Sequence, residues 1–225
     1  MNNFKYILYT TLLFIISTSS SFSQDKSFIH CGLSFPNAEL SSTAHNNELS
    51  GGAEIGFNIG FQYIQPFSNT GFGLCMGIDM NYNMLKQETK NDFEDLFNEN
   101  IKISHHKYLN FPIYAGLNYT LKLNNKFSLF TNLCATFNSL KITDEIIKNK
   151  SIGRKIATEY FVSHNIGHMV SGGLLINDNI MISLKYLGVK PQNIDGVTIT
   201  DWHRYMVKRK LKVDIFSLSI GFLLK

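Results

Sequence analysis

The feature that most constrains the fold is a regular alternation of apolar residues with small or polar ones. Over residues 53–63 every odd position is apolar or aromatic, while the even positions are Glu, Gly, Asn, Gly and Gln. Residues 72–84 repeat the pattern with the apolar set at the even positions. Because successive side chains of a β-strand point to opposite faces, each segment predicts a strand with one wholly apolar face.

The same pattern predicts six further strands, which makes eight in the chain. It recurs over residues 109–121, more loosely over 127–139, and weakly over 28–35 and 160–176. The apolar faces of the last two predicted strands are formed by Ile180, Ile182, Leu184 and Tyr186 and by Phe216, Leu218, Ile220 and Phe222.

The connections between these strands alternate in length. Residues 36–51, 85–106, 141–158 and 188–206 form long connections, and residues 66–70, 122–126 and 177–179 form short ones. An up-and-down barrel with tight turns at one rim and display loops at the other has this arrangement, as transmembrane β-barrels do. We therefore predict an all-β fold, an eight-stranded antiparallel up-and-down transmembrane β-barrel.

The alternative is a soluble exported barrel with an apolar ligand in its interior. Charged residues make up 17% of the chain, against about 25% in an average soluble domain. The polar face of the second to fifth predicted strands consists almost entirely of Gly, Asn, Ser, Thr and Gln, with Glu54 and Asp79 as exceptions. Small polar residues suit a narrow interior better than a surface in bulk water, so this distribution favours a barrel that faces lipid.

Tyrosines stand toward the ends of the apolar faces, at Tyr63, Tyr82, Tyr119 and Tyr186. Aromatic residues at both ends of the apolar band form the interfacial girdles of transmembrane barrels. Strands of about ten residues at a tilt near 45° also match the thickness of a bilayer. Both features support the prediction of a membrane barrel.

The N-terminus has the pattern of a secretory signal peptide. Lys5 is followed by an apolar stretch over residues 7–16 and then by a tail rich in Ser and Thr, with Ser21 and Ser23 suiting cleavage before Gln24. We predict a signal peptide over residues 1–23 and a barrel domain over residues 24–225, located in the cell outer membrane.

Three runs resemble a known family of barrels. They are Tyr108-Leu109-Asn110-Phe111-Pro112-Ile113, Ile182-Ser183-Leu184-Lys185-Tyr186 with Asn193-Ile194, and Leu218-Ser219-Ile220-Gly221-Phe222. Over nearly the whole mature chain the sequence is similar to the Bacteroidota outer-membrane β-barrels of the PorT-like and OmpX-like group. The resemblance implies an eight-stranded outer-membrane barrel and names no activity. Barrels of this group usually end on an aromatic residue, whereas this chain ends Phe222-Leu223-Leu224-Lys225.

Few residues suggest a site. Glu54, Asp79 and Lys185 are expected to point inward and to form an ionic network in the lumen, because buried charges are costly unless they are paired. Lys208, Arg209, Lys210 and Lys212 form a basic cluster near the mouth of the last strand. This cluster either binds lipopolysaccharide phosphates or a partner protein, or is a solvated rim balanced by acidic loops. The sequence predicts no catalytic residue, cofactor or metal.

Two function classes follow, and a third comes from the soluble alternative. The first hypothesis is a non-enzymatic barrel that is structural, adhesive or an accessory subunit of a surface or secretion assembly, in contact with outer-membrane lipid and lipopolysaccharide. The second is a rim enzyme acting on lipid or peptide, for which Ser104-His105-His106 and Ser163-His164 supply residue types. The third is an exported barrel that binds an apolar ligand. A net charge of +4 is too small to imply a nucleic-acid partner.

Overall fold

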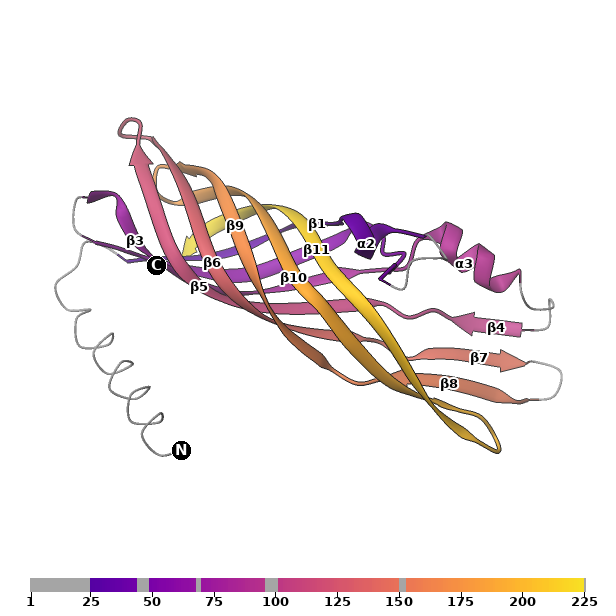
Figure 1. Ribbon diagram of the computed structural model, residues 1–225. Coiled ribbons are helices and arrows are strands. Elements are labelled where there is room, and N and C mark those ends of the chain that lie inside the picture. Colours follow the sequence, from indigo (N-terminus) through magenta and orange to yellow (C-terminus); the bar gives the residue numbers. More distant parts are fainter. Residues whose placement is uncertain (1–24, 44–48, 68–69, 96–100, 150–152, 225) are drawn as a thin grey trace, which may run out of the picture.

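Eight strands close into a ring. The computed structural model describes residues 25–43, 49–67, 70–95, 101–149 and 153–224. Each ring strand pairs antiparallel with its neighbours, and β11 closes the ring by pairing with both β10 and β1 (Figure 1). In order around the ring, the strands are β1 (Lys26–Pro36), β2 (Gly56–Pro66), β3 (Phe72–Asn83), β5 (Tyr108–Lys122), β6 (Phe127–Ile142), β9 (Ser163–Ile176), β10 (Ile180–Ile199) and β11 (Arg204–Leu224). The predicted barrel is confirmed.

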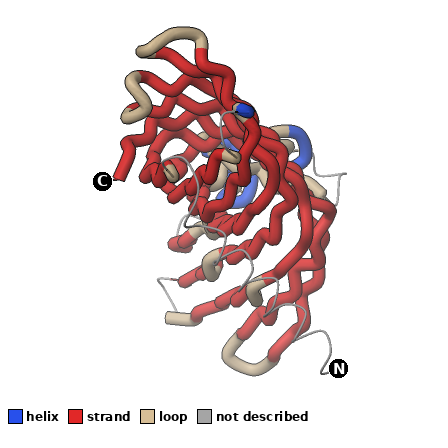
Figure 2. The backbone as a smooth tube through the Cα atoms, turned by 90° about the vertical axis from the view of Figure 1, so that its left-hand side faces the viewer, coloured by secondary structure: helices blue, strands red, loops and turns tan. Residues whose placement is uncertain are grey.

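The two ends of the barrel differ as the connection lengths predict. At the turn end, short connections join β2 to β3, β5 to β6 and β9 to β10. The N-terminal end of β1 and the C-terminal end of β11 also lie there. The longer connections lie at the other end, which we call the loop end (Figure 1). Viewed along a direction at right angles, the strands wind around a common axis (Figure 2).

A belt of apolar side chains covers the outside of the turn-end part of the ring. Facing residues on neighbouring strands match in kind: Leu218 of β11 lies opposite Leu33 of β1 and Leu184 of β10, and all three are about half exposed. Further members of the belt are Ile29, Phe57, Ile59, Phe61, Ile78, Ile113, Leu117, Leu133, Phe137, Val170, Ile182 and Ile220. Most of the residues between them point inward and are small or polar, so the middle of this part of the barrel is apolar outside and polar inside, as in a lipid environment.

Above the belt this polarity reverses. From Val207 onward the odd positions of β11 face inward, and these inward residues change from polar at Ser219 and Ser217 to apolar at Val213 and Leu211. The even positions face outward, and they change from exposed apolar residues up to Phe216 to Asp214 and then lysines. The strand does not rotate; its outer face changes from exposed apolar side chains to Asp214, which Tyr186 and Lys212 cover, and then to lysines. This change is expected where lipid gives way to water.

This reversal corrects two predictions about the last strands. Residues 188–206 were expected to form a long loop, but β10 continues to Ile199 and β11 begins at Arg204, so they form a hairpin. The apolar residues of the sequence change phase between Val213 and Phe216, a pattern that predicts a bulge in the last strand. The pairing shift instead occurs in β10, between Val189 and Gln192, and Asp214 lies on the outer face of β11.

Three short strands extend the wall at the loop end. β8 (Lys155–Tyr160) pairs with β10, β7 (Glu145–Asn149) with β8, and β4 (Ile101–Ser104) with β7. We call these strands, with the loop-end parts of β10 and β11, the outer sheet. The predicted strand over residues 160–176 therefore begins only at Ser163, because Tyr160 ends β8.

Two helices lie in the loop-end connections: α2 (Ala38–Ser41) follows β1, and α3 (Gln87–Glu94) follows β3 (Figure 1). Neither helix is long and apolar enough to span a membrane. The predicted signal peptide lies outside the described residues.

The belt generates the first prediction. Leu117→Arg places a charge at the centre of the lipid-facing surface and should destabilise the barrel in lipid vesicles by about 2–4 kcal/mol. Leu123→Arg is the matched control, because Leu123 is similarly exposed but lies in the turn after β5 and should cost at most about 1 kcal/mol. Urea unfolding, followed by heat-modifiable mobility on gels, measures both. Equal losses in the two variants would contradict the lipid-facing assignment.

Candidate functional site

An ionic centre occupies the middle of the lumen. Lys185 Nζ of β10 donates to Asp79 Oδ2 of β3 at 3.0 Å and to Oδ1 at 3.2 Å. His30 Nε2 of β1 lies 3.0 Å from Asp79 Oδ1 and 2.9 Å from Lys185 Nζ. Lys185 Nζ also lies 3.2 Å from the hydroxyl of Tyr114 on β5. Lys185 and Asp79 are only 2% and 4% exposed, so each charge depends on the other for compensation.

Two glycines make room for this centre. A Cβ atom on Gly60 would lie 2.2 Å from Asp79 Oδ1 and 2.6 Å from His30 Nε2. A Cβ atom on Gly77 would lie 2.5 Å from the hydroxyl oxygen of Tyr114. The small residues in the alternating pattern of β2 and β3 therefore leave the space that the long side chains from other strands fill.

The structure brings together two of the three residues predicted for the lumen network. Asp79 and Lys185 form its core, whereas Glu54 is exposed and takes no part. The prediction for Glu54 is wrong because β2 begins only at Gly56, and at Ala53 the chain instead forms a bridge with Leu85. The alternation of inward and outward side chains in β2, on which the prediction relied, does not extend back to residue 54.

His30 and Tyr114 were missed as members of the centre. Both occupy inward positions of their strands, and alternation alone could have placed them there. Their heights relative to Asp79 depend on the stagger between strands, which the sequence does not specify.

Layers of amide and hydroxyl groups surround the centre. Asn58 Nδ2 donates to Asn81 Oδ1 at 2.9 Å, and the hydroxyls of Ser219 and Ser217 donate to these two asparagines. Nearer the turn end, Asn118 and Asn132 form a second such pair. These bonds satisfy buried polar groups across neighbouring strands, as a buried polar network requires.

Apolar clusters close the lumen at both ends. At the turn end Phe28, Ile64, Phe130, Leu175 and Met181 pack together and are almost fully buried. At the loop end Leu40 of α2 enters a larger cluster and packs against inward residues of the wall. That cluster also contains Ala53, Leu85, Tyr108, Leu140, Ile142, Tyr160, Leu187, Val189, Ile194, Leu211, Val213 and Ile215. The lumen is filled with side chains along its length, as expected for eight strands.

Hydrogen bonds hold the segment after α2 in the mouth of the barrel. The hydroxyl of Tyr108 donates to the carbonyl of Gly51, and Arg209 Nη2 donates to the carbonyl of Ser50 at 2.9 Å. His106 contacts the Tyr108 hydroxyl at 3.0 Å and Glu145 Oε2 at 2.8 Å. These contacts tie the β1–β2 connection to β5, β7 and β11.

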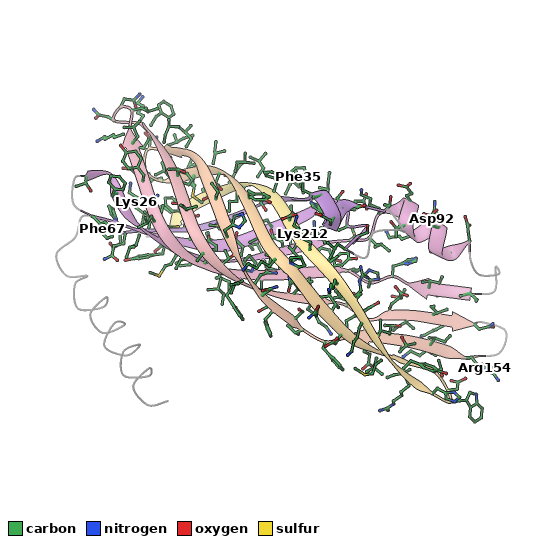
Figure 3. All side chains as sticks on the ribbon, viewed as in Figure 1. Lys26, Phe35, Phe67, Asp92, Arg154 and Lys212 are labelled. Atoms are coloured by element: carbon green, nitrogen blue, oxygen red, sulfur yellow. The ribbon has the colours of Figure 1, made fainter. Side chains whose placement is uncertain are left out.

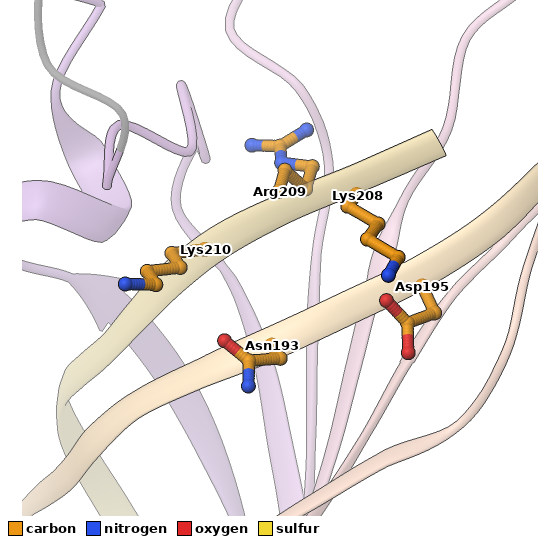
Figure 4. A pocket seen from close by; sticks show the side chains of 5 residues that line it. All are labelled: Asn193, Asp195, Lys208, Arg209 and Lys210. Atoms are coloured by element: carbon orange, nitrogen blue, oxygen red, sulfur yellow. The ribbon is translucent and has the colours of Figure 1, made fainter. Parts of the chain in front are cut away.

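The predicted basic cluster divides between the two faces of β11. Lys208, Lys210 and Lys212 point outward above the belt, whereas Arg209 points to the inner side. A cavity of about 600 Å³ is lined by Asn193, Asp195, Lys208, Arg209 and Lys210 (Figure 4). Because the Arg209 guanidinium points to the inner side, the outward charges at this cavity are those of Lys208, Lys210 and Asp195, which sum to a net positive charge.

Lys212 does not line that cavity and lies nearer the belt along β11. It is paired with Asp214 Oδ2 at 3.0 Å and with Glu39 Oε2 at 3.3 Å. A hydrogen bond from its own backbone N–H, followed by the contact with Lys212, lowers the pKa of Glu39. Lys212 is therefore neutralised by two carboxylates, and the outward basic surface consists of Lys208 and Lys210.

The candidate serine and histidine residues at the rim are also separated. His105 contacts Glu94 Oε1 at 2.8 Å, and His106 contributes to the contacts in the mouth. Ser163 faces the lumen side of β9, so it does not pair with its neighbour His164. His164 instead meets Ser139 of β6, with 2.9 Å between Ser139 Oγ and His164 Nδ1. The sequence did not suggest Ser139, because the contact depends on the register between β6 and β9.

Comparisons with known proteins agree with this architecture. No protein-family model matches the chain, and no curated protein sequence matches it. A major outer membrane protein from Thermus thermophilus superposes with a TM-score of 0.55 and 8% identity, covering 90% of this chain and 100% of that one. OprG from Pseudomonas aeruginosa superposes with a TM-score of 0.51 and 11% identity, covering 90% and 97%. Ail of Yersinia pestis is 16% identical with a TM-score of 0.41, covering 90% and 100%.

The first two likenesses establish the fold of outer-membrane β-barrel proteins. This chain adds its own evidence, an apolar belt that runs around the turn-end part of the ring, as the lipid-facing band of a transmembrane barrel does. The protein is therefore an eight-stranded β-barrel of the outer membrane, with the loop end outward, since such barrels have short periplasmic turns and longer external loops.

The ionic centre generates the second prediction. Lys185→Met removes one partner of a buried pair and should destabilise the barrel by about 3–5 kcal/mol, because Asp79 is left as an uncompensated charge. Lys26→Met is the control: Lys26 pairs with the exposed Asp178 at 2.7 Å, and such pairs contribute at most about 1 kcal/mol. Urea unfolding in lipid vesicles measures both. A Lys185 variant no less stable than the Lys26 variant would show that the centre has no structural role.

Proposed function

We propose that the protein is a non-conducting barrel that works by contact at its loop end, as a structural or adhesive component or as an accessory subunit of a surface or secretion assembly. The observation that carries this proposal is the filled lumen, with an apolar cluster at each end and the ionic centre between them. A barrel without an internal path acts through the surface that it displays. The resemblance to PorT-like barrels is in line with a role in such an assembly.

The outer sheet provides the contact surface. It stands beyond the apolar belt, and Arg154 marks its far end in Figure 3. The hairpin between β10 and β11 carries large exposed side chains, with Trp202 80% exposed and Tyr205 and Met206 more than half exposed. Aromatic and methionine side chains are enriched at protein interfaces. Exposed in water above the membrane, this tip suits a protein partner.

The outward lysines suit an anionic partner at the membrane surface. Lys208 and Lys210 lie above the lipid boundary on β11 and line the same positively charged cavity (Figure 4). Outer-leaflet lipopolysaccharide carries phosphate groups at about this height, and cations attract them by counter-charge. We therefore propose lipopolysaccharide as the lipid partner of this part of the sheet.

The third prediction tests the lipid partner. A Lys208→Glu, Lys210→Glu double variant should bind lipopolysaccharide micelles at least about tenfold more weakly at low salt, and the difference should shrink as salt rises. A Lys122→Glu, Lys126→Glu variant, altered at the turn end, should bind like the wild type. Titration calorimetry with the folded protein in detergent measures both. Equal binding by all three proteins would contradict the proposal.

The fourth prediction tests the closed lumen. In planar bilayers the purified barrel should give no unitary conductance steps, because both ends and the middle of the lumen are filled. A general porin in the same bilayer serves as the positive control for insertion. Reproducible steps from the wild-type protein would reject a contact role that depends on a closed barrel.

A further inference from the structure

A serine and a histidine meet on the outward face of the wall, beyond the contact role proposed above. Ser139 of β6 lies directly opposite His164 of β9 in the strand register. Ser139 Oγ is 2.9 Å from His164 Nδ1, a normal hydrogen-bond length. With the ring hydrogen on Nε2, the hydroxyl donates to Nδ1, which is the arrangement in which a histidine activates a serine as a nucleophile.

Stacking holds the histidine in this orientation. The ring of His164 lies on that of Phe137, with centroids 5.4 Å apart and planes inclined by 15°. Phe137 precedes Ser139 by two residues on the same face of β6, so one strand supplies both the hydroxyl and the surface that supports the ring.

The pair lies where the apolar belt ends on the outward face of β6. Along the outward face of β6, Phe137 is the last member of the apolar belt, and it is followed by Ser139 and then Lys141. The outer surface thus changes from apolar to polar at Ser139. In a lipid leaflet the ester groups lie at this boundary, between the acyl chains and the headgroups.

A shallow apolar groove in the belt reaches Phe137, the residue on which His164 stacks, although Ser139 and His164 do not line it. It has a volume of about 740 Å³, and Phe137 forms part of its wall next to the histidine. The small Ala115 and Ala135 lie in the groove, and larger apolar side chains surround them, among them Phe61 and Ile113. A groove of this size and polarity, open to the membrane, fits an acyl chain.

We propose that Ser139 and His164 are catalytic residues that hydrolyse carboxylic esters of outer-leaflet lipids, with the acyl chain in the adjoining groove. Ser139 Oγ attacks the ester carbonyl carbon while His164 Nδ1 takes the hydroxyl proton. The bond to the lipid alcohol then breaks, and His164 returns the proton to the alcohol oxygen, which releases a lysolipid. Water, deprotonated by His164, attacks the acyl-Ser139 ester, and the fatty acid leaves as the proton returns to Ser139.

The experiment uses the full-length mature barrel, folded into vesicles of phosphatidylethanolamine and phosphatidylglycerol, with lysolipid and fatty acid followed by mass spectrometry. The wild type should release both products in equal amounts. Ser139→Ala and His164→Ala should each lose at least about a hundredfold in rate, the usual contribution of a nucleophile and its base. Added imidazole should restore part of the activity of His164→Ala.

Matched controls separate chemistry from folding. Ser163→Ala and His168→Ala change a neighbouring serine and a second outward histidine of β9 and should retain wild-type rates. A fluorophosphonate lipid analogue should modify Ser139 in the wild type and in both controls, but not in His164→Ala. Absence of lysolipid, release that survives Ser139→Ala, or no adduct on Ser139 would each overturn the proposal. None of these results bears on the contact role, which depends on the outer sheet.

Discussion

The structure depends on one requirement, that no backbone N–H or C=O group of a lipid-embedded strand is left unpaired. Each such group would cost several kcal/mol in hydrocarbon, so a sheet in a membrane must have no open edge. The pairing of β1 with β11, from Ser27 opposite Leu224 to Pro36 opposite Ile215, removes the edges that the first and last ring strands would otherwise have. The antiparallel ring, the outward apolar belt and the narrow lumen all follow from this closure.

Closure also determines what the interior contains. A ring of eight strands encloses too little space for a water-filled path and too much for glycine and serine alone. Long side chains on some strands, such as Lys185 and Tyr114, therefore reach over glycines on others. At the loop end the exterior is water, and the same wall encloses an ordinary apolar core around Leu40 and Leu211. The same wall thus forms a lipid-facing barrel at the turn end and a small water-facing sheet at the loop end.

The sequence predicted the features that depend on one strand at a time. Alternation identified the eight ring strands, their lipid-facing sides and the short connections at the turn end. The prediction failed at Glu54, because this residue lies before β2 begins and does not follow the alternation of that strand. It also failed over residues 188–206, where charged residues face outward and the hairpin was predicted to be a loop. The short strands β4, β7 and β8 were missed for the same reason. Neither of their faces meets lipid, so lipid does not sort their residues into an apolar face and a polar one.

The candidate sites depended on register and were only partly predictable. Asp79 and Lys185 are 106 residues apart, and their inward positions could be deduced, but their common height and their contact with His30 could not. Ser139 and His164 meet because β6 and β9 pair with one particular offset. No local pattern specifies that offset, because it results from the stagger that closes the whole ring.

We place the boundary between lipid and water on the outer face of β11 between Phe216 and Asp214, while the inner face stays buried. Spin labels on single cysteines test it most directly, in a variant with Cys31, Cys75 and Cys134 replaced by serine and folded into bilayers. A label at Leu218→Cys should be relaxed by oxygen, one at Lys210→Cys by a water-soluble nickel chelate, and one at Leu211→Cys weakly by either. If the nickel chelate relaxed the label at residue 218 as strongly as the one at residue 210, the belt would face water and the barrel would not span the membrane there.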